Sequence, residues 1–195
     1  MRATALLVAA LIAGLGAAGC GDEDEFTGSP NPARERSDPP AKAPPGWRVF
    51  KNPRAGFTLS VPPGWPARAR GSATLIRSTD RLVAVTVAAD RSEAARTVPP
   101  MRYALRTFRA LPGFRRLRPE EATRKVKGSP YASARVDGAG TLVKRRQRQH
   151  ITVAAFQRPR RVTYTIVAFS GAGATAYANE IRLMLASLRA RRPAL

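Results

Sequence analysis

The stretch Gly56-Phe-Thr-Leu-Ser-Val-Pro-Pro-Gly-Trp65 decides which fold this chain adopts. Across Phe57–Val61 the odd positions are large and apolar, while the even positions carry hydroxyl groups. This alternation is typical of a β-strand with one face buried and the other exposed. The following Pro-Pro-Gly stops the strand, because proline cannot donate a backbone hydrogen bond to a neighbouring strand. We therefore expect the core to begin with a strand and a turn that brings Trp65 back to cover it.

Similar apolar segments recur outward from this strand. They predict further strands over residues 73–77, 82–88, 131–136, 141–156 and 162–169. Asp-Gly-Ala-Gly at 137–140 and Arg-Pro-Arg-Arg at 158–161 are typical of turns between the last three strands. Strands joined by such short turns favour an antiparallel sheet.

Two helices are expected beside these strands. The first begins at Pro99-Pro100, carries apolar residues every three or four positions from Met101 to Leu111, and ends before Pro112-Gly113. The second covers about residues 174–188, and its apolar stripe consists of Tyr177, Ile181, Met184, Leu185 and Leu188. The predicted class is α+β, an antiparallel β-sheet with helices packed on it, in a single domain of residues 46–195.

The first strand and the last helix together carry a family resemblance. Gly56–Trp65 paired with Asn179-Glu-Ile-Arg-Leu-Met-Leu-Ala-Ser-Leu188 resembles the PsbP-like superfamily, which includes the Mog-type Ran-binding proteins and many small lipoproteins of high-GC Gram-positive bacteria. The resemblance implies a PsbP-like α/β/α sandwich. It implies no catalytic centre, because the family consists mainly of binding or assembly proteins. No functional residue is carried over, since the matching segments are core and turn positions.

The N-terminus predicts export and a lipid anchor. An apolar run shorter than the roughly 20 residues of a membrane-spanning helix leads into small residues and the single cysteine, Cys20. Leu15-Gly-Ala-Ala-Gly-Cys20 resembles the lipobox of bacterial lipoproteins, which implies a signal peptide over residues 1–19 and a diacylated Cys20. Ala17 stands where the lipobox more often has Leu, so cleavage after Ala18 and a secreted product stay open as the alternative.

Residues 20–45 are expected to form a disordered tether behind the lipidated cysteine. They open with an acidic cluster at 22–25, contain six prolines, and offer Phe26 as their only large apolar residue. Such a composition cannot bury a core. With Cys20 used for lipid, the domain has no cysteine for a disulfide, so its stability must come from packing.

The domain is strongly basic. Residues 46–195 hold 30 of the 34 Lys and Arg but seven of the 13 Asp and Glu, a formal charge of +23. Arg outnumbers Lys by 29 to 5, so the codon bias of a high-GC genome competes with function as the explanation. In either case the surface attracts anions. The candidate anion-binding or partner-binding residues are Lys144, Arg145, Arg146, Arg148, Arg158, Arg160 and Arg161.

These residues are expected at the solvent-exposed part of a long strand and the turn that follows it. Lys144, Arg146 and Arg148 alternate along the strand predicted over 141–156, so they should share one face. The sequence has no helix-turn-helix, zinc finger or aromatic RNA-binding pattern. We therefore expect anionic lipid, an anionic envelope polymer or an envelope protein as the partner, and no nucleic acid.

Catalytic and metal-binding patterns are weak. The single histidine, His150, lies in a predicted strand, and Ser170 lacks the Gly-x-Ser-x-Gly frame of a nucleophile, so a turn or helix-cap role is expected for it. The carboxylates are scattered, Glu120-Glu121 is expected to open a loop, and no Cys or His cluster can hold zinc. We expect no enzymatic activity, no metal site and no cofactor.

Three function hypotheses stay open from the sequence. The leading one is a lipid-anchored, extracytoplasmic binding or assembly protein on the outer face of the cell membrane. The second is a carrier or sensor of an apolar or amphiphilic ligand held between the sheet and the helices. The third is a cryptic hydrolase.

Overall fold

The computed structural model describes residues 43–158, 162–171 and 174–190. The expected signal peptide, Cys20, nearly all of the tether, Arg160 and Arg161 lie outside the described residues. Within the described ranges, no helix is long and apolar enough to cross a membrane.

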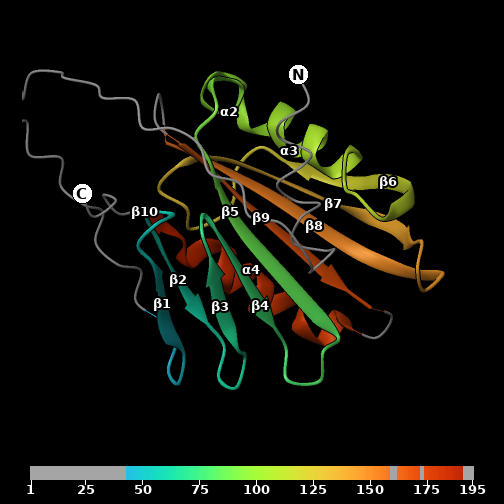
Figure 1. The fold of residues 1–195 in the computed structure, drawn as a ribbon, viewed down its shortest axis with the longest axis horizontal. Helices are drawn as coiled ribbons and strands as arrows, with labels where there is room; N and C mark the ends of the chain where they lie inside the picture. Colours follow the sequence, from blue (N-terminus) through green and yellow to red (C-terminus); the bar gives the residue numbers. More distant parts are fainter. Residues whose placement is uncertain (1–42, 159–161, 172–173, 191–195) are drawn as a thin grey trace, which may run out of the picture.

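A seven-stranded sheet, antiparallel throughout, forms the centre of the fold (Figure 1). Its strands, in spatial order, are β3 (Ala67–Arg70), β4 (Ala73–Arg77), β5 (Val83–Asp90), β9 (Val162–Ser170), β8 (Gln147–Arg158), β7 (Ala132–Leu142) and β6 (Phe114–Thr123). A second sheet of three strands has the order β1 (Arg48–Asn52), β2 (Phe57–Val61) and β10 (Arg189–Ala190). The helices are α2 (Glu93–Thr97), α3 (Pro100–Arg109) and α4 (Ala178–Ser187), with the short 3-10 turn η1 (Ala174–Tyr177) before α4. The structure confirms the predicted α+β class.

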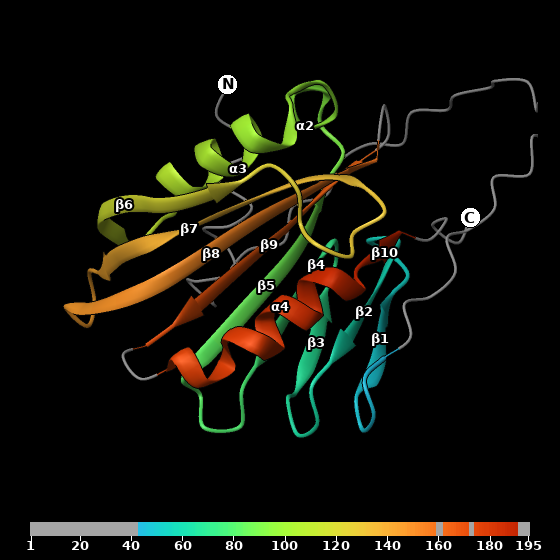
Figure 2. The same cartoon turned by 180° about the vertical axis from the view of Figure 1, so that it is seen from behind.

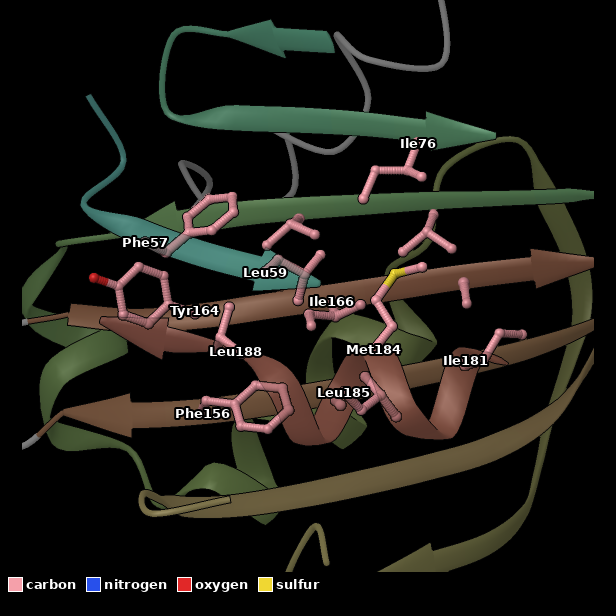
Figure 3. Packing of buried hydrophobic residues seen from close by; sticks show 14 of the residues in the cluster. Phe57, Leu59, Ile76, Phe156, Tyr164, Ile166, Ile181, Met184, Leu185 and Leu188 are labelled. Carbon is pink, nitrogen blue, oxygen red and sulfur yellow. The ribbon is translucent and has the colours of Figure 1, made fainter. Parts of the chain in front are cut away.

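Helices cover both faces of the large sheet. α2 and α3 lie on one face, while α4 and the small sheet lie on the other (Figures 1 and 2). On the α4 face, Phe57 and Leu59 from β2 pack with Ile166 from β9 and with Met184 and Leu185 from α4 (Figure 3). On the opposite face, the core joins α3 to the middle of β7 and β8. Two apolar cores, one on each side of the sheet, thus stabilise the domain.

β2 occupies the predicted positions but is buried on both faces rather than one. Thr58 is 4% exposed and Ser60 is 2% exposed, because the strand lies between β1 and β10 and beneath the end of α4. The Ser60 N–H donates a hydrogen bond to Ser187 Oγ at 2.9 Å. The turn after β2 brings Trp65 into the core, where it packs edge-to-face on Tyr177 with ring centroids 5.5 Å apart.

The predicted turn at 137–140 is wrong. These residues continue β7 without a break, and each pairs with β8. The glycine at 138, which indicated a turn, instead allows β6 and α3 to lie directly against β7. A Cβ on Gly138 would lie 2.2 Å from the Arg118 carbonyl oxygen and 2.8 Å from Phe108 Cζ. β6 and α3 both press on the strand at this point, so no side chain fits there.

The strand predicted over 141–156 is also wrong, because the structure divides this segment between two strands. The chain turns at residues 143–146, and β8 begins only at Gln147. The sequence prediction missed β1, β3, β10, α2 and β6. β6 is an edge strand with Pro119 and many charges, and two register irregularities interrupt its pairing with β7. A proline and an edge position are compatible, because one side of an edge strand has no partner to bond. Glu120 and Glu121, expected to open a loop, lie in this strand.

The C-terminal helix is confirmed with a shorter α-helical part. η1 precedes it, and α4 ends at Ser187, so Leu188 lies just past the helix. Ile181, Met184, Leu185 and Leu188 are each at most 6% exposed and face the sheet, as the stripe predicted.

Candidate functional site

The first candidate surface is the tip of the β7–β8 hairpin, defined here as residues 143–146. Lys144, Arg145 and Arg146 are all exposed, and Val143 beside them is 48% exposed, one of the most exposed large apolar side chains of the described residues. Figures 1 and 2 show the hairpin extending beyond both α3 and α4. The Val143 N–H donates to the Gly113 carbonyl at 2.9 Å, which ties the tip to the start of β6. The expected projection of basic residues into solvent is confirmed.

The expected geometry of these residues is wrong in one respect. Lys144 and Arg146 lie in the turn rather than on the strand, so they do not share a strand face with Arg148. Arg148 lies on β8, where its side chain is 79% exposed and forms an ion pair with Glu120 of β6 at 3.3 Å. Arg146 has a left-handed backbone, with φ of 50°, because the chain must reverse within four residues.

A shallow groove of about 270 Å³ adjoins the hairpin tip on the β6–β8 part of the sheet. Arg116, Arg118 and Arg148 line it, and its floor is made of small residues that include Ala139 and Thr141. The left-handed backbone of Arg116, with φ of 54°, coincides with the first irregularity of β6. The edge strand and the hairpin thus add three cations next to the tip. The sequence prediction did not assign Arg116 and Arg118 to a site, because β6 was not recognised as a strand.

Arg158 lies at the opposite end of β8 from the hairpin tip. A strand of 12 residues separates Gln147 from Arg158, which corresponds to roughly 35–40 Å at about 3.3 Å per residue. The predicted set of seven basic residues therefore does not form one surface. Lys144, Arg145, Arg146 and Arg148 are brought together, Arg158 is far from them, and Arg160 and Arg161 lie outside the described residues.

A polar cluster lies on the α4 face of β7 and β8. Asp137, 6% exposed, accepts hydrogen bonds from Thr152 Oγ1 at 2.6 Å and from an Arg135 guanidinium nitrogen at 2.8 Å. His150 Nε2 lies 3.7 Å from the same carboxylate. Burial raises the pKa of Asp137, but the nearby His150 imidazole, the hydrogen bonds from Arg135 and Thr152 and the charge of Arg135 outweigh this effect. The pKa of Asp137 therefore lies below its ordinary value of 3.8.

Ser170 is the last residue of β9 and not a turn or cap residue as expected. It pairs with His150 across the β8–β9 ladder, and Asp137 lies on the next strand, so serine, histidine and aspartate occupy three adjacent strands. Within the described part of the chain, no hydrogen bond joins Ser170 to His150, and Ser170 is 5% exposed. The arrangement lacks the direct contact between nucleophile and base that acyl transfer needs. In the described ranges, no group of three or more His, Cys, Asp and Glu side chains is placed to hold a metal ion.

The second candidate surface is a groove of about 1290 Å³ between α3 and the β6–β7 loop, residues 124–131. We call it the α3 groove. Ala104 and Phe108 are buried against the sheet, and Met101 and Leu105, one turn apart, lie next around the helix and are half-buried. The following stripe is exposed and cationic: Arg102, Arg106 and Arg109. Apolar and basic side chains of one helix therefore line the same groove.

The β6–β7 loop forms the opposite wall of the α3 groove. It contributes Pro130, with Ala132 from the start of β7, to the apolar surface. Its cations are Arg124 and Lys125. None of the residues that line the groove is acidic, and no ion pair involves its five cations within the described part of the chain.

Several contacts hold this wall in place. Val126 is buried in the α4-side core, and its N–H donates to Ser133 Oγ at 3.0 Å. The Tyr131 hydroxyl accepts from the Ala190 N–H at 2.7 Å. Gly128 has a φ of +81°, and a Cβ there would lie 3.2 Å from the Ala186 Cβ, so the loop closely approaches α4. These contacts fix the position of the loop relative to the sheet and α4.

Sequence reasoning did not single out the α3 groove. One signal was available: cations at positions 102, 106 and 109 follow a helical spacing directly beside the half-buried Met101 and Leu105. The loop residues gave no local signal, since only the fold places residues 124–133 beside α3.

Known proteins share the fold but little sequence with this chain. No protein-family model and no curated protein sequence matches it. The solution structure of cyanobacterial PsbP (CyanoP) from Synechocystis is similar, with a TM-score of 0.54 and 11% identity over 84% of this chain and 98% of that one. The Ran-binding protein Mog1p of Saccharomyces cerevisiae is similar with a TM-score of 0.52 and 9% identity, over 73% of this chain and 94% of its own.

A crystal structure from Bacteroides thetaiotaomicron is also similar, with a TM-score of 0.54 and 14% identity over 75% of this chain. This chain spans about half of that protein's length, 49%. Identities this low establish the architecture and do not transfer a binding site. The chain therefore has the α+β fold that cyanobacterial PsbP and yeast Mog1p share.

Proposed function

We propose that this chain is a non-catalytic bacterial lipoprotein, anchored through Cys20 to the outer face of the cell membrane, whose β7–β8 hairpin tip contacts anionic lipid headgroups. The observation that carries the proposal is the composition of the tip. A half-exposed valine stands next to three exposed cations on a hairpin that projects past the helices. The lipobox-like segment ending at Cys20 supports the anchor.

The physical basis is the interaction of the tip with a charged surface. A basic residue near an anionic membrane contributes about 1 kcal/mol, and this attraction decays within a Debye length of about 8 Å at physiological salt. Among the described residues, Lys144, Arg145 and Arg146 have no acidic partner to compete with headgroups. A lipid anchor keeps the domain close to the bilayer, which raises the effective concentration of these contacts.

The anchor is tested by Cys20→Ser. In cell fractionation the parent is expected in the membrane fraction, and the variant is expected to lose that association because two acyl chains anchor a protein stably. A variant that stays in the membrane as fully as the parent would disprove the lipid anchor. A parent that is found in the culture medium would instead support the secreted product.

The hairpin contact is tested with the full chain carrying Cys20→Ser, so that lipidation does not contribute. Its binding to vesicles of phosphatidylcholine with and without phosphatidylglycerol is measured at low and physiological salt. The triple variant Lys144→Gln, Arg145→Gln, Arg146→Gln should lose most of the salt-sensitive binding. The matched control changes three exposed cations on β3 and β4 by the same charge: Arg68→Gln, Arg70→Gln and Arg77→Gln.

The two triple variants separate a specific contact from net charge. Equal losses in both would show that overall charge, and not the hairpin tip, attracts the membrane. Absence of binding by the parent would also contradict the proposal and would leave an envelope protein or polymer as the partner. The non-catalytic part is checked with a serine-reactive phosphonate probe, since labelling of Ser170 would contradict it.

A further inference from the structure

The α3 groove carries a separate inference, because its composition does not fit an ordinary solvated surface. Five cations surround an apolar floor, and neither wall contributes a carboxylate. On α3, Arg102 and Arg106 are spaced by four residues, an arrangement in which like charges destabilise the helix. Arg102 also lies in the first turn, where the helix dipole disfavours a cation, and that turn has no acidic residue. A bound anion would relieve both repulsions.

The floor of the groove indicates an apolar part of the same ligand. Met101 and Leu105 leave part of their side chains in the groove, and Pro130 and Ala132 line its other wall. Because Met101 and Leu105 lie one turn apart, the apolar strip runs along the helix and can accompany an extended chain. Sites for drug-sized ligands measure about 300–1,000 Å³, so the groove of about 1290 Å³ has room for an extended chain and a headgroup.

We propose that the α3 groove binds a single-chain lipid with an anionic phosphate headgroup, its acyl chain on the floor and its phosphate among the rim cations. Four of the five rim cations are arginines, whose planar fork donates two parallel hydrogen bonds to a phosphate. The two halves of the site thus recognise the two halves of one amphiphile. The proposal goes beyond the membrane contact of the hairpin tip and does not depend on it.

The test uses the full chain with Cys20→Ser, so that no attached acyl chain competes for the groove. Titration calorimetry measures its affinity for palmitoyl lysophosphatidylglycerol and for palmitoyl lysophosphatidylcholine, both below their critical micelle concentrations. The two probes share one acyl chain and differ in net charge. The anionic probe is expected to bind roughly tenfold or more tightly at physiological salt, because several rim cations contribute.

Two variants address the two parts of the groove. Ala132→Phe fills the floor from an exposed strand position, and it should weaken both probes by roughly tenfold or more. Arg102→Gln with Arg106→Gln should weaken the anionic probe by roughly tenfold, and it should weaken the zwitterionic probe by clearly less, because the choline charge already offsets the phosphate charge of that probe. The control Arg68→Gln with Arg70→Gln removes the same charge from β3 and should change neither affinity. Thermal melts confirm that each variant is folded.

Three results would overturn the proposal. Equal affinity for the two probes would show that the rim does not select charge. Unchanged binding by Ala132→Phe would place the lipid elsewhere, and failure of the parent to bind either probe would exclude this ligand class. The hairpin triple variant should keep full affinity for the lysolipid, so failure here and failure of the membrane contact are distinguishable.

Discussion

Replacing Gly138 by Ala tests the packing at the centre of the α3 face. A Cβ at this position would lie 2.2 Å from the Arg118 carbonyl oxygen, 2.9 Å from the Pro119 Cα and 2.8 Å from Phe108 Cζ. Two of these three atoms belong to the backbone of β6, so a change of rotamer cannot remove the clash. Either β6 moves away from β7 or α3 shifts with Phe108.

The expected loss of stability is large for the addition of one methyl group. Overpacking of a core costs about 1–3 kcal/mol when side chains can adjust, and more when they cannot. The reduced entropy of the unfolded chain returns only about 0.4–1 kcal/mol for Gly→Ala. We expect a net destabilisation of about 3 kcal/mol or more. For a chain of this size, that corresponds to a decrease in Tm of about 6–12 °C.

Thermal and urea unfolding of the full chain measure this effect, with Gly140→Ala as the graded control. At Gly140 a Cβ would meet the side-chain ends of Leu117 at 2.8 Å and Ile151 at 3.0 Å, which can move, so a smaller loss is expected. If Gly138 instead lay in an exposed turn, Ala would fit without cost. A Gly138→Ala variant as stable as the parent would therefore refute the continuous strand β7 and its close contact with β6.

Three further substitutions, the first with a surface control, test other contacts by urea unfolding. The side chain of Leu185 in α4 is 1% exposed, so Leu185→Ala should cost about 2–5 kcal/mol of stability. The control Arg182→Ala, at an exposed position of the same helix, should change stability by less than about 0.5 kcal/mol. Similar small effects of both substitutions would mean that α4 is not docked on the sheet. Ser187→Ala leaves the buried Ser60 N–H without its acceptor and should cost about 1–3 kcal/mol, an effect that a solvated N–H would not show. Asp137 has a lowered pKa, so its stabilisation is present above its ordinary value of 3.8 and is lost as the pH falls through the folded-state value. The stability difference between the parent and Asp137→Asn should thus shrink from pH 7 to pH 3, and a constant difference would argue against this assignment.

Elements with a regular local pattern could be predicted from the sequence. The alternation in Phe57–Val61 and the apolar stripe that ends in Leu188 each identified an element at the correct place. Ala73–Arg77 was predicted to the residue as β4. In these segments the burial of one side follows directly from the spacing of apolar residues, so no distant contact is needed to recognise them.

Segments whose residues are chosen for tertiary packing were misread, because the prediction used only the local sequence pattern. Gly138 and Gly140 look like turn residues locally, but their lack of a side chain serves the contact with α3 and β6. β6 looks like a loop because Pro119 and charged residues interrupt any alternation, and it becomes a strand only through its pairing with β7. The tertiary environment outweighs local preference at both places.

Some features of the candidate sites could likewise be predicted from the sequence, and others could not. The sequence by itself determined the excess of cations, the lipobox-like cysteine and the basic character of residues 144–148, since these depend on composition and order alone. Only the tertiary structure decided that Arg158 lies at the far end of β8 and that Arg116 and Arg118 lie beside Arg148. It also decided that the loop over residues 124–131 stands opposite α3 and forms a groove. The physical reason is that a groove belongs to two surfaces at once, and strand pairing and core packing set the distance between segments that the sequence keeps apart.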